Sequence, residues 1–100
     1  MIPDGFEWDD IKRDTVLRER GIDFVDAAKV LLGTVYQYRS PWHDEPRFVA
    51  IGPLTEGILI AIVYTIRDEN IRIITARRAR RNEQAAYRNA LSAQRDEGED

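Results

Sequence analysis

The stretch from Ile58 to Tyr64 constrains the fold of this chain more than any other, because it is apolar at every position. Side chains of a β-strand point alternately to the two faces of a sheet, so a strand without polar positions must be buried on both faces. A transmembrane helix needs about 20 apolar residues, and this run is far shorter. The run therefore predicts the central strand of a sheet that a helix covers on at least one side.

Other segments that are rich in β-branched and aromatic residues predict further strands. They cover residues 6–8, 34–39, 47–52 and 71–77, and the central strand covers 58–66. The connectors 53–57 and 67–70 have the length and the turn residues of hairpins, which join antiparallel neighbours. The predicted sheet is therefore an antiparallel meander of about four to five strands.

Three segments predict helices, at residues 10–20, 24–32 and 79–93. Asp9 and Asp23 precede the first two, and aspartate is a favoured N-cap because its side chain accepts a hydrogen bond from a free backbone N–H. Gly21 follows the first helix in the position where glycine commonly ends one. Together, the elements predict an α+β fold with two N-terminal helices and a C-terminal helix packed on the sheet.

Length and composition predict a single domain. The chain has 100 residues, of which 43% are hydrophobic and 33% charged, as in globular proteins. The predicted domain covers residues 6–93, and residues 94–100 form an acidic tail that we expect to be flexible.

The absence of cysteine excludes disulfides, thiol nucleophiles and zinc–cysteine sites. The start of the chain lacks a signal-peptide pattern, and we expect a soluble, cytoplasmic protein without contact to a membrane.

Arginine dominates the basic residues of the chain. There are 13 arginines, two lysines and a net charge of −3, a balance that argues at first against a nucleic-acid partner. From Tyr64 to Arg88, however, seven arginines stand against three acids. The planar guanidinium group offers a fork of donors that fits phosphate. This local excess predicts a site for an anionic substrate, with RNA as the expected one. The alternative is that these arginines are solvated and paired with neighbouring acids.

The richest part of this region runs from Ile71 to Arg81, where an apolar strand leads into a helix. Strict alternation along the strand predicts that Arg77 shares one face with Ile73, whereas Arg72 and Arg78 share the other. Guanidinium groups that converge where a sheet gives way to a helix would suit an RNA phosphate.

Several short blocks follow one another along residues 6 to 88. They are Phe6-Glu7-Trp8-Asp9 with Lys12, Gly21-Ile22-Asp23-Phe24, Arg47-Phe48 with Ile51-Gly52, Val63-Tyr64-Thr65, Ile71 to Ala79, and Glu83 with Tyr87. In this order they resemble the BrnT family, the toxins of BrnT/BrnA type II toxin–antitoxin systems. The resemblance implies a RelE-like α/β fold and a ribonuclease activity that arrests growth. It also implies neutralisation by a cognate BrnA-like ribbon-helix-helix antitoxin, in a hetero-oligomer.

The chain departs from the family pattern at three positions of the first helix. Family members usually carry an asparagine there and a Lys-His pair before the glycine, where this chain has Val16, Glu19 and Arg20. Arginine does not lose its proton in proteins, so Arg20 cannot replace a histidine as a base. Two alternatives to an active nuclease therefore stay open: a non-catalytic RNA- or protein-binding homologue, and an accessory DNA-binding subunit of an antitoxin complex.

RNA can be cleaved without a metal when its 2′-hydroxyl attacks the adjacent phosphorus, provided that cations stabilise the charge that develops. The catalytic candidates are the basic and phenolic residues that fall in the family blocks, namely Arg72, Arg77, Arg47, Lys12 and Tyr64. Tyr64 could orient the substrate or donate a proton, or its ring could lie in the core. Glu7 is a candidate base. The substrate-binding candidates are Arg78, Arg80, Arg81 and Trp42, the last because an aromatic ring can stack on a base.

The only histidine, His43, lies in a loop outside the family blocks, and we expect it to be dispensable. Asp44 and Glu45 follow it directly, but three adjacent loop residues rarely direct their side chains at one ion. The sequence therefore predicts neither a metal site nor a cofactor.

Overall fold

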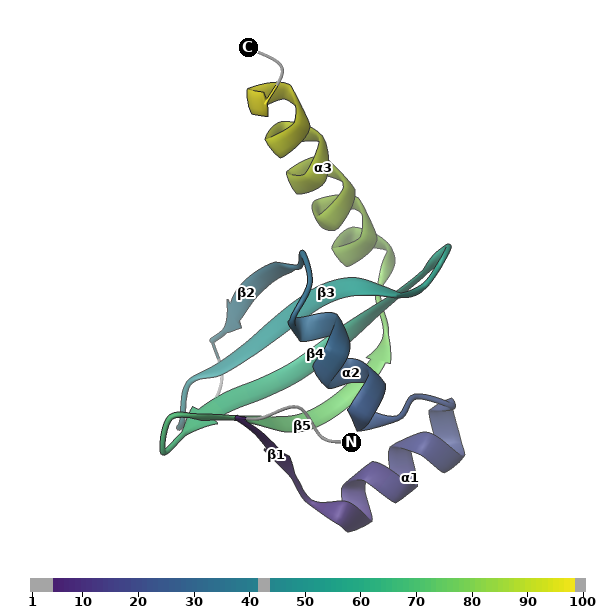
Figure 1. The fold of residues 1–100 in the computed structure, drawn as a ribbon, viewed down its shortest axis with the longest axis vertical. Coiled ribbons are helices and arrows are strands. Elements are labelled where there is room, and N and C mark those ends of the chain that lie inside the picture. Colours follow the sequence, from purple (N-terminus) through teal and green to yellow (C-terminus); the bar gives the residue numbers. More distant parts are fainter. Residues whose placement is uncertain (1–4, 42–43, 99–100) are drawn as a thin grey trace.

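The computed structural model describes residues 5–41 and 44–98 of the chain. In this part of the chain, three helices and five strands form one α+β unit (Figure 1). The helices are α1 (Asp10–Arg20), α2 (Phe24–Leu31) and α3 (Arg81–Gly98). The strands are β1 (Phe6–Trp8), β2 (Tyr36–Ser40), β3 (Arg47–Thr55), β4 (Ile58–Arg67) and β5 (Asn70–Arg78).

The apolar run forms β4, which is the middle strand of a sheet in the order β1-β5-β4-β3-β2. Strands β2 to β5 are an antiparallel meander, as predicted. The prediction of a wholly antiparallel sheet is wrong for β1, which pairs in parallel with β5, Phe6 opposite Ile71 and Trp8 opposite Ile73. The hairpin rule applies only to strands joined by a short turn, and β1 reaches the edge of the sheet from a distant part of the sequence.

A β-bulge in β5 changes which side chains share a face. Val63 pairs with Thr75 while the next residue of β4, Tyr64, pairs with Ile73, so Ile74 is an extra residue in β5. Arg72 therefore lies opposite Thr65, and Arg77 opposite Ala61, two positions of β4 that share a face. Strict alternation had placed the two arginines on different faces, and that prediction was wrong.

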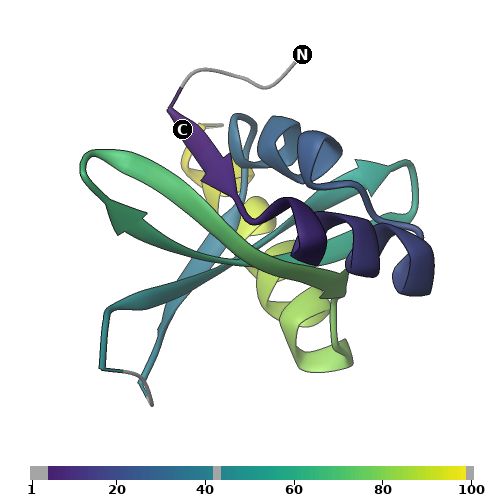
Figure 2. The same ribbon diagram turned by 90° about the horizontal axis from the view of Figure 1, so that it is seen from below.

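The two faces of the sheet are covered differently (Figure 2). Phe24, Ala27 and Ala28 of α2 pack with Ile60 and Ile62 of β4 on one face, and α1 adds to this core. The start of α3 covers part of the other face, where Tyr87 packs against a smaller core around Ile51 and Ala61. We call this second face the arginine face, because it carries Arg47, Arg67, Arg72 and Arg77.

The predicted ends of α1 and the start of α2 are confirmed. The Asp9 side chain accepts a hydrogen bond from the backbone N–H of Lys12, and Asp23 accepts one from Val25. Gly21 ends α1 with a φ of 71°, a conformation that glycine adopts without strain. The last helix begins at Arg81 and extends to Gly98, beyond the predicted end at residue 93. No helix among the described residues is long and apolar enough to cross a membrane.

Candidate active site

A cavity of about 510 Å³ opens between the first turns of α1 and the arginine face. Its walls come from the start of α1, the segment before β3, and strands β3 to β5. The lining residues are Asp9, Ile11, Lys12, Thr15, Glu45, Arg47, Arg67, Arg72, Ile73 and Ile74. We call it the cationic cavity, because four of these side chains carry a positive charge and two a negative one.

The cationic cavity brings together three of the five predicted catalytic residues: Lys12 from the first turn of α1, Arg47 from the start of β3, and Arg72 from β5. They are far apart in the sequence, and their meeting depends on two features of the fold. The parallel pairing of β1 with β5 sets the start of α1 beside Arg72. The bulge at Ile74 leaves Arg72 on the same face as Arg47.

Two of the four cations have carboxylate partners. Arg72 donates to Glu7 on the neighbouring strand at 3.0 Å, and both side chains are about one-third exposed. Arg67 donates to the two carboxylate oxygens of Glu45 at 3.0 and 3.2 Å. These pairs hold the guanidinium groups in place while leaving them accessible from the cavity.

A buried hydrogen bond positions the segment before β3. The hydroxyl of Thr65, which is 1% exposed, donates to the backbone oxygen of Pro46 at 2.6 Å. Pro46 lies between Glu45 and Arg47, so this bond fixes both of them against β4. Thr65 also lies opposite Arg72, so it contacts both the strand that carries Arg72 and the segment that carries Glu45 and Arg47.

Arg47 has a buried donor without an acceptor. Its Nε atom is inaccessible to solvent and has no hydrogen-bond partner among the residues that the structure describes. A buried polar group left unpaired costs about 1–3 kcal/mol. Arg47 lines the cavity and takes part in none of the salt bridges of the described residues, so an anion bound there would meet a guanidinium group that no carboxylate neutralises.

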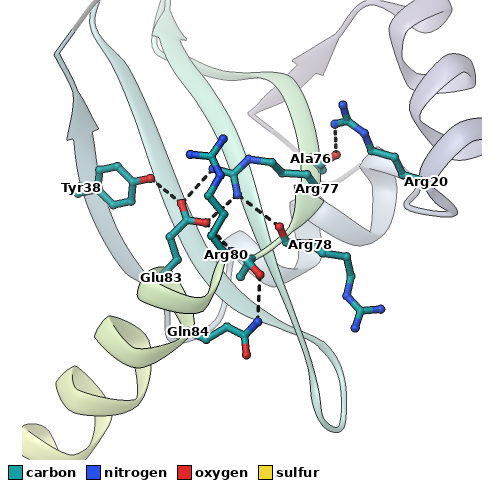
Figure 3. Close-up of polar contacts among 9 residues, drawn as sticks. Arg20, Tyr38, Ala76, Arg77, Arg78, Arg80, Glu83 and Gln84 are labelled. Carbon is teal, nitrogen blue, oxygen red and sulfur yellow. Dashed lines mark hydrogen bonds and ion pairs between the residues drawn. The ribbon is translucent and has the colours of Figure 1, made fainter.

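Arg77 lies on the same face but in a second cluster, at the junction of β5 and α3 (Figure 3). It contacts both carboxylate oxygens of Glu83, at 2.7 and 3.0 Å, and Tyr38 donates to the same carboxylate at 2.5 Å. The backbone N–H of Arg80 donates to Glu83 at 2.8 Å, which caps the start of α3. Arg77 is thus part of an ion pair and does not line the cationic cavity.

The electrostatics of this second cluster favour the charged form of Glu83, which is only 3% exposed. Burial raises the pKa of its carboxyl group, but hydrogen bonds from Arg77, Tyr38 and the Arg80 backbone outweigh burial and lower the pKa to about 2. The hydrogen bond to Glu83 raises the pKa of Arg77 in turn. Burial, followed by the bond to Glu83, raises the pKa of the Tyr38 hydroxyl.

The other predicted residues lie outside the cationic cavity. Tyr64 is 7% exposed, stacks on Phe48 on the face opposite the arginines, and donates its hydroxyl to Gln37 at 2.6 Å. Burial raises the pKa of that hydroxyl. Three predicted substrate-binding arginines are exposed around the junction of β5 and α3, namely Arg78, Arg80 and Arg81. Trp42 and His43 lie outside the described residues.

The three departures from the family pattern have different environments. Val16 is buried in the core at 3% exposure, and Glu19 is exposed. The guanidinium of Arg20 donates to the backbone oxygen of Ala76 at 2.9 Å (Figure 3). It also donates to the hydroxyl of Thr75 at 3.2 Å. Arg20 therefore ties the end of α1 to β5.

Three charged lining residues, Arg67, Glu45 and Asp9, were not named as site candidates in the sequence, and Asp9 was predicted only as a helix cap. Arg67 follows Thr65 by two positions on β4, so both side chains lie on one face of the sheet. This spacing could have identified Arg67 as a candidate, because Thr65 lies opposite Arg72. Glu45 lies in a loop, and no local pattern gives the direction of its side chain. No group of three His, Asp or Glu side chains in the described part of the chain is arranged to hold a metal ion.

Comparisons with known proteins agree with these observations. The sequence model of a family described as the ribonuclease toxin BrnT of type II toxin–antitoxin systems matches residues 8–83. The fold is similar to the crystal structure of the Brucella abortus ribonuclease toxin BrnT, with a TM-score of 0.59 and 27% sequence identity. That match covers 76% of this chain and 96% of the other. A search of curated proteins found no match. The predicted resemblance is thereby confirmed, and the chain belongs to the BrnT family of ribonuclease toxins.

Proposed function

We propose that this chain is a metal-independent endoribonuclease, the toxin of a type II toxin–antitoxin system, and that the cationic cavity is its active site. The observation that carries the proposal is the convergence of Lys12, Arg47, Arg67 and Arg72 on one cavity. Each of these cations comes from a different element, α1, β3, β4 and β5 in that order. If these cations were merely solvated surface residues, there would be no need for the bulge in β5 and the parallel pairing of β1 to bring them together.

The proposed chemistry is an attack of the 2′-hydroxyl of RNA on the adjacent phosphorus. A bond forms between the 2′-oxygen and phosphorus, and the bond from phosphorus to the 5′-oxygen breaks. Negative charge grows on the phosphate oxygens in the transition state. Preorganised cations in a partly desolvated site stabilise that charge, and the loss of one donor can cost about 3 kcal/mol. Arg47 and Arg72 supply guanidinium donors, and Lys12 supplies a point charge from the opposite wall.

The proposal extends to the partners and the place of action. A BrnA-like ribbon-helix-helix antitoxin binds the toxin and neutralises it in a hetero-oligomer, and both act in the cytoplasm, where RNA is found. We also propose a RelE-like arrangement, in which the sheet presents its cations to RNA. Membership of a type II toxin family supports the existence of an antitoxin partner.

One observation favours a second candidate, a homologue that binds RNA without cleaving it. Arg20 stands where the family usually has a histidine, and its guanidinium is hydrogen-bonded to β5. A chain without a base at that position would still bind phosphate through Arg47 and Arg72. This candidate predicts RNA binding with no products.

Incubation of the purified chain with a mixed-sequence RNA transcript in the presence of EDTA tests the proposal. We expect cleavage that the chelator does not reduce, with products ending in a 2′,3′-cyclic phosphate and a 5′-hydroxyl. A single-stranded DNA of the same sequence is the control, because it lacks the attacking hydroxyl. Expression without an antitoxin should arrest growth. Intact RNA together with normal growth would contradict the proposal, and intact RNA that is tightly bound would favour the second candidate.

A further inference from the structure

The chemistry proposed above requires a group that accepts the proton of the 2′-hydroxyl. Carboxylates and histidines are the usual acceptors in proteins. The carboxylates of Asp9 and Glu45 line the cationic cavity, and that of Glu7 contacts Arg72 beside it. A proton acceptor must line the cavity and keep lone pairs for the substrate without being needed for another role, so the position and the existing contacts of each carboxylate decide between them.

The contacts of Asp9 and Glu7 assign them to structural roles. Asp9 accepts the backbone N–H of Lys12 at 3.0 Å and so caps α1. Glu7 is paired with Arg72 across neighbouring strands and is not part of the cavity lining. Its contact orients a guanidinium group that the phosphate needs.

Glu45 differs from both. Its side chain lines the cavity beside Arg47, and it is 38% exposed. Both of its oxygens contact a single donor, the Nη2 atom of Arg67, at 3.0 and 3.2 Å, so each oxygen keeps lone pairs for another donor. The neighbouring Pro46 is anchored by Thr65, which restricts the backbone that carries Glu45.

We propose that Glu45 is the general base of this active site, with Arg67 as the residue that positions it; the inference rests on the proposed ribonuclease function. The proton of the 2′-hydroxyl passes to a carboxylate oxygen of Glu45 as the 2′-oxygen bonds to phosphorus. The bond to the 5′-oxygen breaks, and that oxygen takes a proton from water. Arg47 and Arg72 hold the phosphate oxygens meanwhile. The proton on Glu45 returns to solvent after the products leave.

The test measures single-turnover cleavage of a mixed-sequence RNA by Glu45→Gln, Glu45→Asp and the wild-type chain across a range of pH. Glutamine keeps the shape of the side chain but cannot accept the proton. General base catalysis contributes about 10²–10⁴-fold, so we expect a fall of about 100-fold or more in Glu45→Gln. The wild-type rate should fall as the pH is lowered, and this decline should be absent in Glu45→Gln. Glu45→Asp should retain an intermediate rate and the decline.

Binding and folding controls separate a base from a merely structural group. Affinity is measured with the same RNA carrying 2′-O-methyl groups, which cannot be cleaved, and Glu45→Gln should bind it within about threefold of the wild type. Glu56→Gln is the matched control, because Glu56 is an exposed carboxylate in the β3–β4 turn, at the opposite end of these strands. It should cleave at the wild-type rate. Thermal melting checks that each variant is folded.

The outcomes distinguish this inference from the proposed function. Wild-type protein that leaves RNA intact would overturn both. Cleavage by Glu45→Gln at the wild-type rate would overturn only the role of Glu45, and tighter RNA binding by that variant would identify Glu45 as a shield of the cations instead. A loss of rate explained by lost affinity would equally exclude a base. A pH decline that disappears in Glu7→Gln but not in Glu45→Gln would transfer the role to Glu7.

Discussion

Arg77 and Glu83 are joined by two parallel contacts, 2.7 Å from Nη1 to Oε1 and 3.0 Å from Nη2 to Oε2. The pair connects the end of β5 to the first turn of α3, and Tyr38 adds a contact from β2. Beyond this point α3 extends away from the sheet (Figure 1). The side chains of the pair are 21% and 3% exposed, so the contact is largely shielded from solvent. Arg77 thus holds α3 on the arginine face, whereas Arg72 lines the cationic cavity.

Arg77→Ala should therefore lower the stability of the fold. The substitution leaves the buried carboxylate of Glu83 without its cation, and breaking a buried pair in this way costs about 3 kcal/mol. Urea denaturation measures the change in the free energy of unfolding. Arg18→Ala is the control, because Arg18 is 69% exposed and contacts only Asp14 at 3.7 Å among the salt bridges of the described residues. Equal stability of the two variants would contradict the role assigned to Arg77.

Stability should also fall in acid because of Glu83. Its pKa is about 2 in the folded chain, against an ordinary value of 4.5. A lowered pKa means that the charged form stabilises the fold, so this contribution is complete above pH 4.5 and disappears as the pH falls toward 2. Its size is on the order of 3 kcal/mol. Denaturation at several pH values should show that wild type and Glu83→Gln converge between pH 4.5 and 2. A constant difference over that interval would rule out the proposed linkage.

The β4–β5 hairpin offers a substitution that should stabilise the chain. Asp68 and Glu69 in its turn have φ values of 51° and 70°, a region that glycine adopts freely, asparagine and aspartate tolerate, and glutamate adopts only with strain. The double change Asp68→Asn and Glu69→Gly gives the turn that such hairpins prefer, and we expect a gain of about 1 kcal/mol. Gly57→Ala in the β3–β4 turn is the opposite control. Gly57 has a φ of 81°, so this substitution should lower the stability of the fold by a similar amount. Thermal melting should show a higher midpoint for the double variant and a lower midpoint for Gly57→Ala.

Gly52 of β3 lies close to Val30 of α2 and to Val35. A Cβ atom at this position would lie 2.7 Å from Cγ1 of Val30 and 3.0 Å from Cγ1 of Val35. Gly52→Ala should therefore cost about 1–3 kcal/mol through overpacking. Val30→Ala removes the nearest obstacle, so the double variant should be more stable than the sum of the single changes predicts. Additive losses would mean that the contact with Val30 is not the source of the cost.

Local signals in the sequence predicted much of the fold. The apolar run 58–64 identified the central strand. Asp9, Gly21 and Asp23 marked helix ends, because a cap residue acts on backbone groups within a few residues of it. The parallel partner of β5 and the bulge at Ile74 depend on contacts between distant segments. A periodic pattern carries no information about such contacts.

The candidate site was predictable only in part for the same reason. Lys12, Arg47 and Arg72 were proposed from the blocks that resemble the family, and the structure gathers all three. The sequence showed Arg77 and Glu83 six positions apart but could not tell a phosphate ligand from an ion pair. Glu45 depends on the path of a loop, which is anchored by a hydrogen bond from Thr65 on another strand.

The most direct test of the account is the single-turnover rate of RNA cleavage by Arg72→Ala, measured beside Arg18→Ala. Arg72 lines the cationic cavity, whereas Arg18 does not. The loss of one donor to the transition state should lower the rate about 100-fold in Arg72→Ala, while Arg18→Ala should keep the wild-type rate. Both variants should melt as folded proteins. A folded Arg72→Ala protein that cleaves RNA as fast as Arg18→Ala would contradict the assignment of the cationic cavity as the active site.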